Sequence, residues 1–176
     1  VFLASHVRLK GHAHNRIKPE PIIKCMKHLS RLLPLSNIVL DLPATSKKRV
    51  FEQAGLLLEN NQGVERAAVY ESLFARERLG STGLGSGIAM PHGRVKGLKA
   101  GVAAFIRLAK PIPFDAPDRQ PVNQLLILLT PEASTQQHLD ILAEVARLFS
   151  NEALRSQLAI ETDPKVVHAL LTEDLR

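Results

Sequence analysis

The sequence predicts an α/β fold, a single domain in which one mixed β-sheet is flanked by helices. Short apolar, β-branched runs alternate along the chain with segments whose apolar residues recur at helical spacing. The run at 122–129 is apolar almost throughout, which is typical of a strand buried on both faces. Strands of this kind, separated by helices, form a parallel or mixed sheet whose faces the helices cover.

Each element has a local signal of its own. Four prolines between Pro111 and Pro121 impose a rigid loop before the last strand. Strands are expected at 37–41, 101–108 and 122–129. Helices are expected between a cap at Thr45 or Ser46 and Gly63, at about 64–78 up to Gly80, at 135–149, at 152–158, and at 164–171 with Asp163 as its cap.

The positive charge of the chain is concentrated at its beginning. The formal net charge is +6, and residues 1–35 supply all of it, with seven Lys or Arg residues against Glu20. The remaining residues hold sixteen basic and sixteen acidic side chains. We therefore interpret 1–35 as a basic N-terminal extension, partly non-native with a true start near Met26, and 36–176 as the domain. A neutral domain argues against nucleic acid as a partner.

Apolar runs and cysteine usage limit where the protein acts. No apolar run approaches the roughly 18–20 residues that a membrane span needs. The single cysteine, Cys25, excludes an internal disulfide and fits a reducing compartment. We therefore expect a cytoplasmic protein with no membrane span.

His92 is the strongest candidate for chemistry among the three histidines outside the extension. It lies between Pro91 and Gly93, after an apolar run at 87–90, where we expect a strand to end and a glycine-lined loop to begin. A neutral imidazole is a competent nucleophile, and glycines let a phosphate approach backbone N–H groups. The candidate phosphate loop comprises Gly83, Gly85, Gly87 and Gly93. The alternative is an ordinary loop histidine held by a backbone hydrogen bond.

Two other kinds of site fit the glycine region and its histidine less well. The G-x-x-x-x-G-K-[ST] pattern of nucleotide loops is absent, and the glycine run precedes a strand instead of following one and opening a helix. Around His92 and His138, no Cys, Asp or Glu has a recognised metal-ligand spacing. We therefore expect no cofactor and no metal, and we interpret Ser81, Thr82 and Ser86 as turn residues.

The segment Gly85-Ser-Gly-Ile-Ala-Met-Pro-His-Gly93 resembles the phosphorylation-site signature of the fructose/mannitol class of IIA domains of the phosphotransferase system. The resemblance extends over roughly residues 36–172 and is greatest to the nitrogen-regulatory subfamily. Further matching segments are Thr45-Ser-Lys-Lys-Arg-Val, Ala75-Arg-Glu-Arg-Leu-Gly-Ser-Thr-Gly83, Pro111-Ile-Pro-Phe-Asp-Ala-Pro-Asp118, Pro121-Val-Asn-Gln-Leu-Leu and His138-Leu. It implies a mannitol-type IIA fold and a phosphocarrier with a phosphohistidine intermediate.

The resemblance also implies roles for individual residues. His92 would receive the phosphoryl group from an HPr-like carrier of the nitrogen-related (NPr) type, Arg76 would face the phosphohistidine, and His138 would lie in the same pocket. Position alone leaves Arg78 as an alternative to Arg76, and His168 is expected to be a partly buried surface histidine. The role would be regulatory, through the phosphorylation state. The alternatives are a free-standing sugar IIA component that passes phosphate to a IIB domain, and a binding module that is not phosphorylated.

Overall fold

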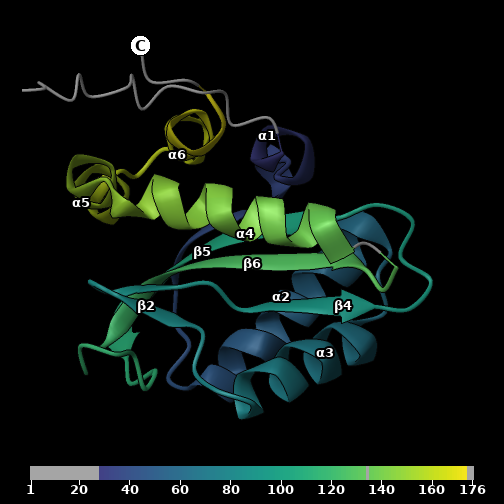
Figure 1. Ribbon diagram of the computed structural model, residues 1–176. Coiled ribbons are helices and arrows are strands. Elements are labelled where there is room, and N and C mark those ends of the chain that lie inside the picture. Colours follow the sequence, from purple (N-terminus) through teal and green to yellow (C-terminus); the bar gives the residue numbers. More distant parts are fainter. Residues whose placement is uncertain (1–27, 134, 174–176) are drawn as a thin grey trace, which may run out of the picture.

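A computed structural model describes residues 28–133 and 135–173 of the chain, and its elements form three layers (Figure 1). One six-stranded mixed sheet lies between two layers of helices. The helices are α1 Leu29–Leu32, α2 Lys47–Gln62, α3 Arg66–Arg78, α4 Thr135–Ser150, α5 Glu152–Ile160 and α6 Pro164–Thr172, with a short 3₁₀ turn at Leu35–Asn37. Helices α2 and α3 cover one face of the sheet, and α1, α4, α5 and α6 cover the other. This architecture confirms the predicted fold class.

The sheet has the order β1-β5-β6-β3-β2, with β4 also paired to β6. Its strands are β1 Ile38–Leu42, β2 Gly83–Gly85, β3 Ile88–Ala89, β4 His92–Val95, β5 Val102–Ile112 and β6 Val122–Pro131. The long strands β5 and β6 are antiparallel, whereas β1 runs parallel to β5, and β3 and β4 run parallel to β6. Strands β3 and β4 therefore follow one another along the same side of β6.

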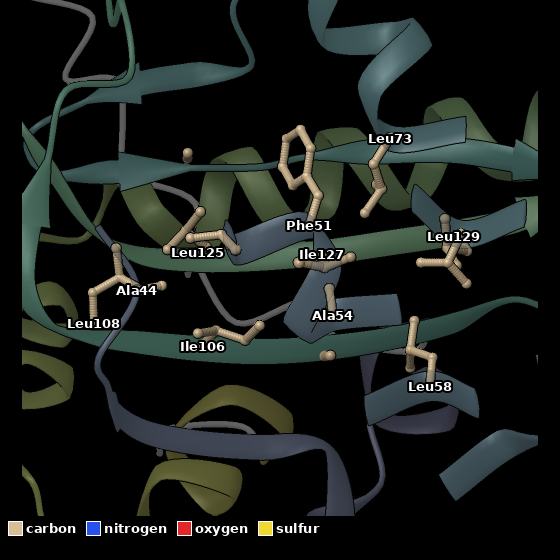
Figure 2. Packing of buried hydrophobic residues seen from close by; sticks show 14 of the residues in the cluster. Ala44, Phe51, Ala54, Leu58, Leu73, Ile106, Leu108, Leu125, Ile127 and Leu129 are labelled. Atoms are coloured by element: carbon tan, nitrogen blue, oxygen red, sulfur yellow. The ribbon is translucent and has the colours of Figure 1, made fainter. Parts of the chain in front are cut away.

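Alternate residues of the central strands supply two separate cores. Ile106, Leu125 and Ile127 face α2 and α3, where they pack with Phe51 and Leu73 (Figure 2). Their immediate neighbours along the strands face α1, α4, α5 and α6. Because side chains alternate between the two faces of a strand, a strand buried on both sides must be apolar throughout, as β6 is.

The five predicted helices are confirmed within a few residues. Of the two candidate caps for α2, the structure selects Ser46, whose side chain accepts a hydrogen bond from the Arg49 backbone N–H. The helix ends at Gly63, which has a φ of 67° and lies in the left-handed region. No helix in the described part of the chain combines the length and apolar character that crossing a bilayer requires.

Two expectations about the strands are wrong. Strand β5 does not end at Leu108 but continues through Pro111 to Ile112. Its pairing with β6 is irregular between Arg107 and Ile112, so the missing N–H of Pro111 falls where the ladder is already interrupted. The structure also contains two short strands that the sequence analysis does not predict, β2 in the glycine-rich region and β4 from His92, whereas β3 lies within the apolar run at 87–90 where a strand is expected to end.

Residues 29–33, which the sequence analysis places in the basic extension, pack into the domain. They form α1 and its C-terminal cap, and Leu29 and Leu33 are fully buried in the core beneath α4 and α6. Glu144 of α4 accepts hydrogen bonds from the backbone N–H groups of His28 and Leu29. The packed unit that the structure describes therefore includes residues before 36. Residues 1–27, with the proposed start near Met26, lie outside the described residues.

Candidate functional site

His92 is the first residue of β4, directly after Met90 and Pro91, which separate β3 from β4. The expectation that a loop begins at His92 is wrong, because a new strand begins there and pairs His92 with Leu128 of β6. The His92 Nδ1 atom lies 2.9 Å from the carbonyl oxygen of Met90. A carbonyl only accepts hydrogen bonds, so in the neutral ring Nδ1 carries the proton and Nε2 carries the lone pair.

Arg76 reaches this lone pair from the last turn of α3. Its Nε atom donates to Nε2 of His92 at 3.0 Å, and its Nη1 atom donates to the carbonyl oxygen of Gly80 at 2.9 Å. The guanidinium is therefore held at two points. Within the described residues its Nη2 atom has no hydrogen-bond acceptor, which leaves donors for an incoming anion.

His138 approaches His92 from the opposite helical layer. It lies in the first turns of α4, is 6% exposed, and its Nδ1 atom lies 2.9 Å from the hydroxyl oxygen of Thr130. The ring centroids of His92 and His138 are 5.4 Å apart. The structure thus brings together all three side chains that the sequence analysis proposes for the site.

The pocket lowers the pKa values of both histidines, which favours their neutral forms at pH 7. Burial is the main cause of the lowered pKa of His92, and the positive charge of Arg76 adds to it, while the bond to Met90 and the charge of Glu77 oppose it. Burial, followed by the proximity of His92 and two arginines, lowers the pKa of His138 to about 4. A neutral His92 with its lone pair on Nε2 is in the form that a nucleophile requires.

Gly93 permits α3 to lie close to β4. A Cβ atom at this position would meet Ser72 Oγ at 2.1 Å, and that hydroxyl donates to the carbonyl oxygen of Arg94 at 2.8 Å. Any larger residue at 93 would push α3 away from the strand. Gly93 therefore supports the approach of Arg76 to His92.

The other three glycines of the proposed phosphate loop lie further along the sheet. Gly83, Gly85 and Gly87 belong to β2 and the turn after it. Ile88, at the end of that turn, pairs with Gln124 of β6, whereas His92 pairs with Leu128, a separation of about 13 Å along the strand.

Polar contacts within the turn fit a structural role for these glycines. The backbone N–H of Ser86 donates to Asp118 at 2.7 Å, so a carboxylate already uses this amide. Gly85 and Gly87 both have positive φ values, 90° and 78°, which a tight turn requires. These contacts favour turn formation over phosphate binding, in agreement with the interpretation of Ser86 as a turn residue.

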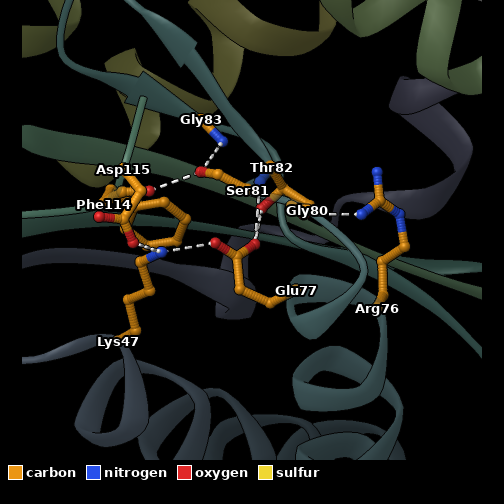
Figure 3. A network of polar contacts seen from close by, with 9 residues as sticks. All are labelled: Lys47, Arg76, Glu77, Gly80, Ser81, Thr82, Gly83, Phe114 and Asp115. Atoms are coloured by element: carbon orange, nitrogen blue, oxygen red, sulfur yellow. Dashed lines mark hydrogen bonds and ion pairs between the residues drawn. The ribbon is translucent and has the colours of Figure 1, made fainter. Parts of the chain in front are cut away.

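Sequence reasoning missed a polar network behind Arg76 (Figure 3). Glu77 contacts Lys47 and Thr82, and Lys47 also contacts Asp115. These residues come from α2, α3 and two loops, and nothing in their sequence spacing indicates that they meet. Ser81 and Thr82 bond to Phe114 and Glu77, which supports their interpretation as turn residues.

His168 lies on α6 and contacts the backbone of the chain before β1. His168 is half-buried, and its Nε2 atom lies 2.8 Å from the carbonyl oxygen of Leu33, as expected of a structural surface histidine. Among residues 28–133 and 135–173, no group of three or more His, Cys, Asp or Glu side chains is arranged to hold a metal ion. The site as described consists of two imidazoles and a guanidinium.

The chain belongs to the class of IIA domains of the phosphotransferase system, with which it shares its sequence pattern and its fold of a mixed sheet between two helical layers. The family model described as "Phosphoenolpyruvate-dependent sugar phosphotransferase system, EIIA 2" matches residues 31–174, and the chain belongs to this family. The family is a phosphotransfer component of that system.

Within the family, the chain is similar to proteins named "Nitrogen regulatory protein". One from Pseudomonas aeruginosa is 36% identical over 149 residues, which cover 84% of this chain and 97% of the relative. The crystal structure of nitrogen regulatory protein IIA-Ntr from Neisseria meningitidis has a TM-score of 0.78 at 51% identity and covers 81% of this chain and 98% of that one. The crystal structure of IIA mannitol from Escherichia coli, with a TM-score of 0.68 at 23% identity over 79% of this chain and 98% of that one, shares the fold.

Proposed function

We propose that this protein is a phosphocarrier and regulator that accepts a phosphoryl group on Nε2 of His92. The donor would be the phosphohistidine of an HPr-like carrier of the nitrogen-related (NPr) type. The observation that carries the proposal is the hydrogen-bonding of His92, because the Met90 carbonyl fixes the proton on Nδ1 and the Arg76 guanidinium meets the lone pair on Nε2. Membership of the EIIA 2 family and similarity to nitrogen regulatory proteins support it.

In the proposed reaction Arg76 Nε releases its hydrogen bond to Nε2 of His92, and the lone pair of Nε2 then attacks phosphorus in line with the donor's N–P bond. As the new N–P bond forms, the old one breaks and its electron pair returns to the donor imidazole. Positive charge develops on the His92 ring, and the Met90 carbonyl oxygen on Nδ1–H stabilises it. Because the donor's N–P bond is already activated, the step balances without a nucleotide.

Arg76 and His138 would stabilise the transferred group. The planar guanidinium of Arg76 is suited to bind two phosphoryl oxygens and always stays charged. If the hydroxyl of Thr130 donates to Nδ1 of His138, the Nε2–H of that ring is available to donate to a third oxygen. The catalytic contribution is positioning and electrostatic stabilisation.

The test is the intact mass of the protein after incubation with phosphoenolpyruvate, an enzyme I-type kinase and an HPr-like carrier. We expect one acid-labile phosphoryl group on the wild type and none on His92→Ala. A donor that phosphorylates another acceptor but adds nothing to the wild type would instead support a binding module that is not phosphorylated. A gain that persists in His92→Ala would assign the reaction to another residue.

The second candidate function is that of a sugar IIA component. It is favoured by a Haloferax volcanii relative named "PTS system fructose-specific EIIA component", 32% identical over 146 residues that cover 82% of this chain and 95% of the relative. The two roles differ in what removes the phosphoryl group. Rapid transfer from phosphorylated protein to a sugar IIB domain would favour sugar uptake. A stable phosphorylated form in the presence of IIB would favour regulation, where an added charge of about −1.5 to −2 changes which partner binds.

A further inference from the structure

Glu77, the residue after Arg76 in α3, is a nearly buried carboxylate that the proposed reaction does not use. Its side chain is 7% exposed. One oxygen accepts a hydrogen bond from Lys47 Nζ at 2.8 Å, and the other accepts from the backbone N–H of Thr82 at 2.9 Å and from its hydroxyl at 2.6 Å. Burying a carboxylate is costly unless it is paired and hydrogen-bonded, so these three donors hold Glu77 in one position.

The bonds from Glu77 hold the segment that orients Arg76. Thr82 lies two residues beyond Gly80, whose carbonyl oxygen accepts from Arg76 Nη1. No heavy atom outside the adjacent residues lies within 4 Å of the position that a Cβ on Gly80 would take, and the backbone N–H of Gly80 donates to the carbonyl oxygen of Glu77 at 3.2 Å, so bonds to residue 77 and not side-chain packing hold this part of the segment. Figure 3 shows Glu77 between Lys47 on one side and the segment from Gly80 to Gly83 on the other, with Arg76 bonded to Gly80.

Arg76 needs such a hold because a free arginine side chain has many rotamers. Fixing it in one conformation costs rotamer entropy. Its two acceptors are Nε2 of His92 and the Gly80 carbonyl oxygen. In phosphoryl transfer, Nε2 becomes bonded to phosphorus and can no longer accept from Arg76. Of these two acceptors, the Gly80 carbonyl oxygen then remains.

Lys47 neutralises the carboxylate beside a site that receives an anion. It lies between Glu77 and Asp115, at 2.8 Å from each, and 4.6 Å from the ring centroid of Phe114. Burial lowers the pKa of Lys47, but the bonds to Asp115 and Glu77 outweigh this effect and the net shift is upward, so Lys47 stays cationic. Without that cation, the charge of Glu77 would repel a phosphoryl group on His92.

We propose that Glu77 is a positioning residue for phosphoryl transfer: anchored by Lys47, it fixes residues 80–82 so that the Gly80 carbonyl holds the Arg76 guanidinium beside His92. This inference rests on the proposed function. It assigns a role to Glu77 that acts through Arg76 and not by contact with the phosphoryl group.

The first test is the rate of His92 phosphorylation as the concentration of the phosphorylated carrier is varied. We expect Glu77→Ala to lower the maximal rate about ten-fold and to change the half-saturating carrier concentration less than two-fold. The double variant Lys47→Met with Glu77→Gln keeps an acceptor for Thr82 and removes both charges, so it should recover most of the rate. The matched control is Glu52→Ala, which breaks the exposed Arg49–Glu52 pair of α2 and should leave the rate unchanged.

The second test separates positioning from a general loss of structure. If Glu77 acts through Arg76, adding Glu77→Ala to Arg76→Ala should lower the rate less than two-fold further. A full ten-fold loss in both backgrounds would overturn the inference. If Glu77→Ala does not unfold cooperatively, Thr82→Val replaces it in the same double-mutant comparison with Arg76→Ala. This variant removes one of the hydrogen bonds to Glu77 with little change of shape, so the expected loss of rate is smaller.

The NMR signal of the Arg76 Nε–H group gives a readout that needs no phosphoryl donor. We expect an ordered, slowly exchanging signal in the wild type and in Glu52→Ala, and its loss in Glu77→Ala. If the wild type accepts phosphate while Glu77→Ala reacts as fast as Glu52→Ala, the inference fails and the proposed function stands. If the wild type accepts no phosphate from a donor that is active on another acceptor, both fail.

Discussion

At the scale of single residues, one carbonyl oxygen and partial burial determine the chemical state of His92. The Met90 carbonyl holds the proton on Nδ1, and burial with a neighbouring guanidinium lowers the pKa of the ring. A histidine in water is partly protonated near neutral pH. In this pocket, the lone pair on Nε2 stays available over a wider pH range.

The first prediction concerns pH. We expect the rate of phosphoryl acceptance by His92, from a donor whose own titration is measured separately, to fall less between pH 8 and pH 6.5 than the titration of an ordinary histidine would require. The main decline should come around and below the lowered pKa of His92, because protonation removes the lone pair. NMR titration of the ring nitrogens should place the midpoint for His138 at about pH 4 and that for His92 below its ordinary value.

The same shifts predict how stability depends on pH. A histidine whose pKa is lowered by folding binds its proton more readily in the unfolded chain, so the free energy of unfolding falls as the pH drops from about 6.5 towards 4. One such group contributes at most about 1.4 kcal/mol per pH unit. His138→Gln should make this slope shallower in denaturant unfolding series, and an unchanged slope would contradict the lowered pKa of His138.

At the scale of elements, local signals predicted the long helices and the two central strands. Helix α2 is an example, because its cap at Ser46, its apolar spacing and its left-handed Gly63 are all local features. Strands β2, β3 and β4 have two to four residues each, too few for a period to be visible. Strands β3 and β4 form because β6 offers them a partner, and β2 pairs in turn with β3. Pairing between distant segments cannot be predicted from local sequence.

The site also combines features that local sequence predicts with contacts between distant residues that it does not predict. The family signature selected His92, Arg76 and His138, and the structure brings these side chains together. The glycines were predicted as one loop because they are close in sequence, yet the register on β6 places Ile88, at the end of the glycine turn, about 13 Å along the strand from His92. The contact of Glu77 with Lys47 joins residues thirty positions apart and has no sequence signal.

Gly93 gives a prediction for the contact between α3 and β4. Gly93→Ala should lower the free energy of unfolding by about 2 kcal/mol, because its Cβ would lie 2.1 Å from Ser72 Oγ. It should also slow phosphorylation, since moving α3 separates Arg76 from His92. Stability is measured by denaturant unfolding, and the rate by intact mass.

Two comparisons make this prediction specific to Ser72. Adding Ser72→Ala removes the 2.1 Å contact and should recover part of the stability lost in Gly93→Ala. Gly97→Ala has a positive φ of 82° but no atom within 4 Å of its Cβ, so Ser72→Ala should not rescue it. If Ser72→Ala recovers none of the stability lost in Gly93→Ala, the close approach of α3 is not the cause of that loss.

At the scale of the whole molecule, the site depends on both helical layers. Arg76 comes from α3 on one face of the sheet, His138 from α4 on the other, and His92 from β4 between them. Any loss of packing in either core therefore changes the geometry of the site. Helix α4 links the site to the beginning of the described chain, because Glu144 on that helix accepts hydrogen bonds from the backbone N–H groups of His28 and Leu29.

The last prediction locates the start of the domain by truncation. A chain that begins at His28 should unfold at nearly the same denaturant concentration as the full chain, and its His92 should be phosphorylated at the same rate. A chain that begins at Ser36 should be several kcal/mol less stable, because it loses the buried side chains of Leu29 and Leu33, each contributing about 1.5–3 kcal/mol. It also leaves the buried carboxylate of Glu144 without the backbone N–H groups of His28 and Leu29, which donate hydrogen bonds to it.

A point variant separates these two causes in the full chain. Leu29→Ala leaves a cavity in the core but keeps the backbone N–H groups, so Glu144 retains its partners and the loss should be about 2–5 kcal/mol. If removal of residues 1–27 already destabilises the domain, the basic extension contributes to folding and its boundary belongs before His28. If removal up to residue 35 costs nothing, α1 is dispensable, and the domain begins where its charge becomes balanced, at Ser36.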